Sequence, residues 1–180
     1  MIRSRRNLVL SAMALIAVTA GAAIAWWLVE PDPAAPEAVN KLLEQTLPDS
    51  AGQPQPIAQW SNKVLVVNFW ATWCAPCVEE MPELQTIGDE YRPRGVEIVG
   101  LGIDSADRIR DFQNRLQIRL PLLVAGATGD ELGRSLGNNT GALPFTVLIG
   151  ADRRIAQRKL GRIRADELRA WLDAELKSWP

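Results

Sequence analysis

The sequence predicts an α/β domain in which a mixed β-sheet is covered by helices on both faces. Short runs of β-branched and other apolar residues alternate with longer segments in which apolar residues recur every three or four positions, as in a helix packed on a sheet. Alternating strands and helices are followed by two strands and a final helix, an order that implies a mixed sheet. The chain has 180 residues. Beyond its N-terminal stretch, this leaves room for one domain of about 140 residues with its own core.

The N-terminal 38 residues are expected to lie outside this domain. Residues 1–7 contain three arginines and form a cytoplasmic basic segment, whereas residues 8–29 contain no charged residue. That apolar stretch is long enough to cross a bilayer of about 30 Å. Basic residues before it and acidic residues after it place the domain outside the cytoplasm. Residues 30–38 are expected to be a proline-rich linker, and residues 39–180 the domain.

A cleaved secretory signal is the alternative to a membrane anchor. Ala23, Ile24 and Ala25 match the small-x-small pattern of a cleavage site. The anchor is favoured because the apolar stretch is longer than a usual signal core and continues to Val29. The domain is exported under both interpretations.

The remaining elements follow in chain order. Turn residues between short apolar segments of residues 45–60 predict an N-terminal hairpin. The predicted strands that follow are residues 64–69, 96–102, 120–125, 145–150 and 155–160. The predicted helices are residues 76–91, 105–117, 130–136 and 165–177, with Ser105 a candidate N-cap. Pro82 is expected to kink the first of these helices because a proline removes one backbone hydrogen bond.

Cys74 and Cys77 are the only cysteines in the chain, and they lie between the first long strand and the helix that follows it. Pro76 suits the first turn of a helix, so Cys74 is expected at the helix N-terminus. Unpaired amides and the helix dipole lower the pKa of a thiol there, which makes Cys74 the candidate nucleophile. Cys77 lies one turn further on the same face and is the candidate resolving thiol.

The composition excludes several classes of function. The chain has no histidine, which removes Ser-His and Cys-His catalysis and leaves few soft ligands for a metal. We therefore expect no metal site and no cofactor beyond a redox-active disulfide. Residues 30–180 carry 17 basic and 21 acidic side chains, which argues against nucleic acid as a partner.

The segment NFWATWCAPCVEEMPEL, together with a later proline just before a strand, resembles the thioredoxin fold. More narrowly, it is similar to the membrane-anchored, extracytoplasmic thioredoxin-like proteins of the TlpA and ResA type. The resemblance covers roughly residues 45–178 and includes an inserted helix and strand at residues 105–125. It implies a thiol:disulfide oxidoreductase that reduces disulfides in partner proteins, as in cytochrome c maturation or copper-site assembly. A membrane protein that carries reducing equivalents across the bilayer is the implied electron donor, and the bacterial periplasm the implied location.

The resemblance also implies roles for single residues. Cys74 matches the nucleophile and Cys77 the resolving cysteine, and Pro144 matches a cis-proline that faces the disulfide. Glu80 matches an acidic residue that tunes the cysteine pair. The residues expected to contact the substrate are Trp73, Ala75, Pro76 and Leu143.

Glu80 and Asn68 are each open to a separate interpretation. Glu80 lies three residues after Cys77, where a carboxylate can take the proton of the resolving thiol or raise the pKa of the thiols by repulsion. The other interpretation is a solvated helix glutamate. Asn68 stands where ordinary cytosolic thioredoxins carry a buried aspartate, so proton transfer must use another group. Two interpretations apply to Trp70 and Trp73, which flank the site. They serve only in packing, in the core or at the surface, or they shield the sulfurs and contact the substrate.

Three rival functions stay open at this point. A thiol oxidant would use the same residues with a higher reduction potential. A Cu(I) chaperone or assembly factor would bind its metal through the two thiolates. A peroxiredoxin-type peroxidase is disfavoured because Thr72 stands two residues before Cys74, rather than the three of the usual loop.

Overall fold

The computed structural model describes Met13 and residues 35–178. The chain divides into two units, residues 1–33 and residues 34–180, and the elements below belong to the second. The predicted membrane segment, residues 8–29, lies outside the described residues except for Met13. Within the described part of the chain, no helix combines the length and the apolar character needed to span a bilayer.

Five strands form the central sheet, in the order β5–β4–β3–β6–β7. The strands are β3 (Val64–Trp70), β4 (Val96–Gly102), β5 (Leu122–Val124), β6 (Phe145–Ile149) and β7 (Ile155–Leu160). The central strand β3 is parallel to β4 and antiparallel to β6, and every residue of β3 is buried. The mixed sheet predicted from the element order is therefore confirmed.

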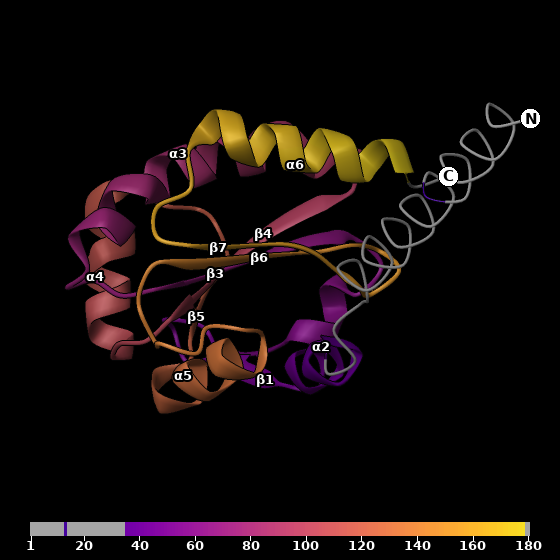
Figure 1. Ribbon diagram of the computed structural model, residues 1–180. Helices are drawn as coiled ribbons and strands as arrows, with labels where there is room; N and C mark the ends of the chain where they lie inside the picture. The colour runs from indigo at the N-terminus through magenta and orange to yellow at the C-terminus, as the bar shows by residue number, and fades with distance from the viewer. Residues whose placement is uncertain (1–12, 14–34, 179–180) are drawn as a thin grey trace, which may run out of the picture. The chain divides into compact units, whose positions relative to one another are not determined.

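Helices cover both faces of this sheet (Figure 1). One face carries α3 (Ala75–Tyr91), α4 (Ala106–Leu116) and α6 (Ala165–Ser178), and the other carries α2 (Ala35–Leu43) and α5 (Gly126–Ser135). Alternate residues of β3 separate the two cores, with Val66 on the α3 side and Val67 on the α5 side. Asn68 follows the same alternation and lies on the α3 side of the sheet.

The N-terminal boundary of the domain differs from the prediction. Residues 35–38, assigned to the linker from sequence, form the first turn of α2, and Ala38 and Val39 are buried against the core of the α5 face. Pro36 suggested an extended spacer, but a proline is also tolerated in the first turn of a helix. Helix α2 was missed for this reason.

The remaining elements agree with the prediction in kind and differ at their ends. The hairpin is formed by β1 (Thr46–Pro48) and β2 (Pro54–Pro56), and a 3₁₀ turn (Ile57–Trp60) follows it. Helix α5 begins four residues earlier than predicted, at Gly126. Helix α3 runs from Ala75 to Tyr91 with Pro82 inside it.

Candidate functional site

The two cysteines lie where β3 gives way to α3. Cys74 is the N-cap residue of α3, with Pro76 in the first turn, as the sequence predicts. The two sulfurs form a disulfide with an S–S distance of 2.11 Å and a Cα–Cα distance of 5.3 Å. Cys74 keeps 7% of its surface exposed and Cys77 none. Of the two cysteines, Cys74 is therefore the one that an incoming reactant can reach.

Hydrogen bonds at two places fix the short turn before Cys74. The backbone N–H of Cys74 donates to the carbonyl of Ala71 at 3.2 Å. The hydroxyl and the backbone N–H of Thr72 both donate to one carboxylate oxygen of Asp104, in the loop after β4. Burial opposes ionisation of Asp104, yet hydrogen bonds from Thr72 and the Ser105 N–H hold the pKa of this carboxyl below its usual value. Sequence reasoning missed Asp104, because its partner stands 32 positions earlier in the chain.

Pro144 lies just before β6, and the Leu143–Pro144 peptide bond is cis, as the resemblance led us to expect. The first residue of β6, Phe145, pairs with Phe69 near the end of β3, so Pro144 lies at the same end of the sheet as the cysteines. Pro144 is buried, and its carbonyl accepts a hydrogen bond from the N–H of Gly161 at 2.8 Å. Leu143 is half-buried against the core that contains both cysteines.

Glu80 is fully buried in α3, one turn beyond Cys77, and is not a solvated surface residue. Its Oε1 accepts a hydrogen bond from Asn68 Nδ2 at 2.7 Å, and its Oε2 accepts one from the backbone N–H of Ile163 at 3.1 Å. Burial raises the pKa of Glu80 to about 7, although both hydrogen bonds and the charge of Arg162 act to lower it. Near neutral pH this carboxyl can therefore either hold or release a proton.

Asn68 connects Glu80 to the next strand of the sheet. Its side chain is fully buried, and Nδ2 donates to Thr146 Oγ1 at 3.1 Å as well as to Glu80. Thr146 lies directly opposite Asn68 in the antiparallel pair of β3 and β6. Sequence reasoning did not single out Thr146, because one threonine in a strand carries no signal until the register of the two strands is known.

Arg162 ties the loop after β7 to the outer surface of α3. Its guanidinium donates to Glu79 Oε2 at 3.0 Å and to Glu83 Oε1 at 2.8 Å. The next residue, Ile163, supplies the N–H that reaches Glu80, and Gly161 supplies the N–H that reaches Pro144. The three consecutive loop residues 161–163 thus contact two regions of the site. Gly161 binds the cis-proline itself, and the next two residues bind glutamates of α3 close to Cys77.

The two tryptophans near the site have different surroundings. Trp70 is fully buried and packs on Phe112 of α4, with ring centroids 4.7 Å apart. Trp73 keeps 65% of its surface exposed. Ala75 and Pro76 are exposed beside it, so three of the four predicted substrate-contact residues are open to solvent next to Cys74.

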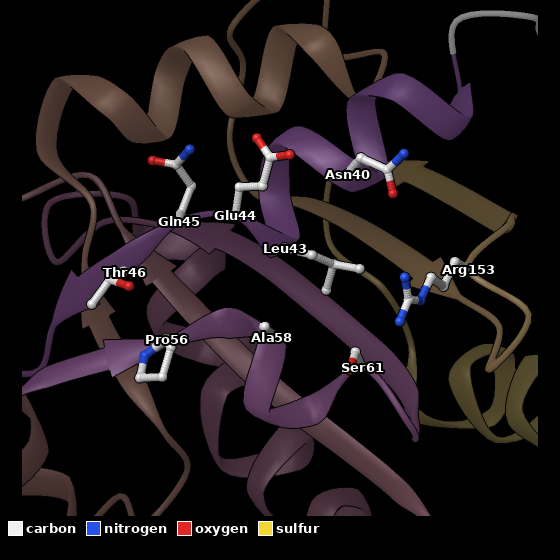
Figure 2. A pocket seen from close by; sticks show the side chains of 9 residues that line it. All are labelled: Asn40, Leu43, Glu44, Gln45, Thr46, Pro56, Ala58, Ser61 and Arg153. Atoms are coloured by element: carbon white, nitrogen blue, oxygen red, sulfur yellow. The ribbon is translucent and has the colours of Figure 1, made fainter.

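A pocket of about 430 Å³ lies among α2, the hairpin, the 3₁₀ turn and the turn before β7 (Figure 2). None of the candidate site residues lines it. Among the described residues, no group of three or more histidine, cysteine, aspartate and glutamate side chains is placed to hold a metal ion.

Known proteins resemble this chain in sequence and in fold. A family model described as Redoxin matches residues 31–172. The thiol-disulfide oxidoreductase ResA of Bacillus anthracis is 30% identical over 125 residues, which cover 69% of this chain and 70% of the relative. ResA of Oceanobacillus iheyensis is 30% identical over 142 residues, covering 78% of this chain and 70% of the relative.

Two solved structures share the fold at lower identity. A thioredoxin family thiol:disulfide interchange protein from Chlorobium tepidum has a TM-score of 0.67 at 20% identity, covering 73% of this chain and 92% of the other. A secreted thiol-disulfide isomerase from Corynebacterium glutamicum has a TM-score of 0.65 at 24% identity, covering 76% and 83%. These two likenesses bear on the fold alone.

Proposed function

Because the chain belongs to the Redoxin family and relatives 30% identical to it are thiol-disulfide oxidoreductases, we propose that it reduces disulfides in partner proteins outside the cytoplasm. The observation that carries the proposal is the Cys74–Cys77 disulfide at the N-terminus of α3, in which Cys77 is fully buried and Cys74 keeps 7% of its surface exposed. The cycle alternates this pair between dithiol and disulfide and uses no other cofactor.

The first step is attack by the Cys74 thiolate on a disulfide of the partner protein. A mixed disulfide forms, and one sulfur of the partner leaves as a thiolate. The helix N-terminus stabilises the Cys74 thiolate through its unpaired N–H groups. Exposed Trp73, Ala75 and Pro76, with half-buried Leu143, form the surface that the partner contacts.

The second step is attack by Cys77 on the Cys74 sulfur of the mixed disulfide. The Cys77 thiol must first lose its proton, and Glu80 is the acceptor: it is buried one turn away with a pKa of about 7. The second sulfur of the partner then leaves and takes up a proton. The partner gains two electrons and two protons, and the Cys74–Cys77 disulfide forms.

The reductase direction requires an electron donor that restores the dithiol. An exported compartment is oxidising, so the electrons must cross the bilayer through a membrane protein, whose exposed dithiol would reduce Cys74–Cys77 by the same exchange chemistry. A membrane anchor at residues 8–29 would keep the domain close to this donor. Cytochrome c maturation or copper-site assembly is the proposed context.

Trapping of mixed disulfides tests the proposed function. In Cys77→Ala, Cys74 can attack a partner but the mixed disulfide cannot be resolved, so partner proteins should accumulate on Cys74 in the native host. Cys74→Ala is the matched control and should trap nothing, because Cys77 is fully buried. If Cys77→Ala accumulates no adducts, disulfide exchange with protein partners is excluded.

The direction of electron flow is tested by the reduction potential of the pair. We expect a potential clearly below that of the strong oxidant DsbA, which lies at about −120 mV. Equilibration with glutathione, followed by separation of dithiol and disulfide forms, measures it. A value near that of DsbA would make the protein an oxidant instead.

A further inference from the structure

The amide of Asn68 uses only one of its two ends. Nδ2 donates both to Glu80 Oε1 at 2.7 Å and to Thr146 Oγ1 at 3.1 Å. The other end, Oδ1, is buried and makes no hydrogen bond to any described residue. A buried polar atom without a partner is costly and calls for an explanation.

We propose that Asn68 is a positioning residue whose amide rotates by half a turn when Glu80 gains or loses its proton, so that Asn68 hydrogen-bonds Glu80 in both states. The inference rests on the proposed function, in which Glu80 takes the proton of Cys77. It goes beyond that function because it assigns Glu80 a hydrogen-bond partner, Asn68, whose orientation follows the protonation state of Glu80.

The orientation present in this structure suits an ionised carboxylate. Both oxygens of Glu80 accept N–H donors, and an ionised carboxylate only accepts hydrogen bonds. When Glu80 is protonated, its O–H needs an acceptor, and an N–H group cannot serve. Rotation of the Asn68 amide brings Oδ1 to the position of Nδ2, where it can accept from the new O–H.

Thr146 fits both orientations, because a hydroxyl can donate as well as accept. It accepts from Nδ2 in the present orientation and would donate to Oδ1 after rotation. The two ends of an amide are nearly equal in size, so the rotation does not disturb the surrounding core. Oδ1 lacks a partner in the present orientation and Nδ2 would lack one after rotation, so the hydrogen bond to the protonated carboxyl is what favours the rotated amide.

The partners of Glu80 also determine which oxygen carries the proton. Oε2 faces the backbone N–H of Ile163, which can only donate. Oε1 faces Asn68, which can present either a donor or an acceptor. The other ionisable groups acting on Glu80 are Arg162 and Glu83, with Cys77 one turn away on α3. The proton therefore belongs on Oε1, the oxygen next to Asn68.

Nuclear magnetic resonance on the full 180-residue chain, labelled with ¹³C in glutamate side chains and ¹⁵N in asparagine amides, tests the proposal. The carboxyl carbon of Glu80 reports its protonation, and Glu80→Gln assigns this signal. Cross-peaks between the Asn68 Nδ2 protons and the Thr146 side chain report the amide orientation. We expect these cross-peaks at pH values above the midpoint of the Glu80 titration and their loss at lower pH. The loss of the cross-peaks and the Glu80 titration should have the same midpoint.

Two results would overturn the inference, and they are distinguishable. If Glu80 titrates but the Asn68–Thr146 cross-peaks persist through the transition, the amide does not rotate and the proposed role of Glu80 stands. If Glu80 does not titrate around neutral pH in either redox state, its role as proton acceptor fails together with the switch. Both measurements are made on the unmodified active site, and Glu80→Gln serves only to assign the carboxyl signal.

A kinetic measurement with Asn68→Leu gives an independent readout. Leucine is close to asparagine in shape but makes no hydrogen bond, so the switch is lost and the pKa of Glu80 rises further because its ionised form loses a donor. We expect the resolving step to slow at least tenfold at neutral pH and its pH profile to move to higher pH. Asn114→Leu, at an exposed position of α4, is the matched control and should leave both unchanged. An unchanged pH profile in Asn68→Leu contradicts the inference.

Discussion

Glu80 shows how burial of one carboxyl couples the stability of the fold to pH. Its pKa is raised from 4.5 to about 7, chiefly by burial. Between these two pH values the folded protein binds more protons at this site than the unfolded chain does. The contribution of Glu80 to stability therefore falls as the pH rises through this window and stays constant above it.

Replacement of Glu80 by Gln should remove this part of the pH dependence. A shift from 4.5 to about 7 corresponds to about 3 kcal/mol of unfolding free energy lost by the wild type between these pH values. Urea unfolding of the oxidised forms across this window measures it. The other carboxyls are common to both proteins and cancel in the difference, so parallel stability curves would refute the assignment.

The surroundings of Glu80 could not be predicted from the sequence, although the residue itself could. Its spacing from Cys77 marks it, but an exposed helix glutamate at the same spacing would look identical. What distinguishes it are Asn68, 12 positions away, and Ile163, 83 positions away. Contacts at such separations depend on the strand register and on the path of a loop, which no local pattern encodes.

At the scale of elements, Gly100 of β4 leaves room for side chains of the neighbouring strands β3 and β5. Gly100 lies opposite Asn68 in the parallel pair of β3 and β4. A Cβ at this position would lie 2.5 Å from Leu122 Cδ2 and 3.0 Å from Trp70 Nε1. The absence of a side chain at Gly100 thus leaves room for the indole of Trp70.

Gly100→Ala should destabilise the protein by about 1–3 kcal/mol, because the added methyl group overpacks a filled core. Gly133→Ala in α5 is the matched control: its Cβ would meet nothing closer than 3.8 Å. An alanine within a helix should stabilise by about 0.5–1 kcal/mol. Urea unfolding of both variants checks the prediction, which is wrong if the two free energies change in the same direction.

The elements themselves were largely predictable. Strands β3, β4 and β7 and helices α4 and α6 have strong periodic patterns, and they agree with the prediction to within a residue or two. Helix α2 was missed because its proline and alanines indicate a linker until it is known that Val39 and Leu42 pack against the sheet. Tertiary burial decides the structure of such a segment, and not its local propensity.

At the scale of the whole molecule, the N-terminal segment decides whether the domain is attached to the membrane or released from it. The apolar stretch of residues 8–29 and the small-x-small pattern at residues 23–25 make different predictions for cell fractions. We expect the full-length chain in the membrane pellet, where it should resist an alkaline carbonate wash, because an uncharged apolar stretch of this length is long enough to span the bilayer.

The double variant Ala23→Leu, Ala25→Leu separates the two interpretations, because it removes the small residues that a signal peptidase requires. An uncleaved anchor predicts that wild type and variant fractionate alike and differ in mass only by the two substitutions. A soluble wild type together with a membrane-bound variant would identify a cleaved signal. The chemistry proposed for Cys74 and Cys77 holds in both cases, but the distance from a membrane donor would differ.

The hydrogen bond from the Ile163 backbone to Glu80 makes this single amide a reporter of events at the sulfurs. An amide bonded to a buried carboxylate exchanges its hydrogen with solvent only when the bond opens. Because protonation weakens a carboxyl oxygen as an acceptor, the exchange rate at Ile163 should follow the charge of Glu80. In the proposed mechanism, the Ile163 N–H therefore reports the transfer of a proton from Cys77 to Glu80.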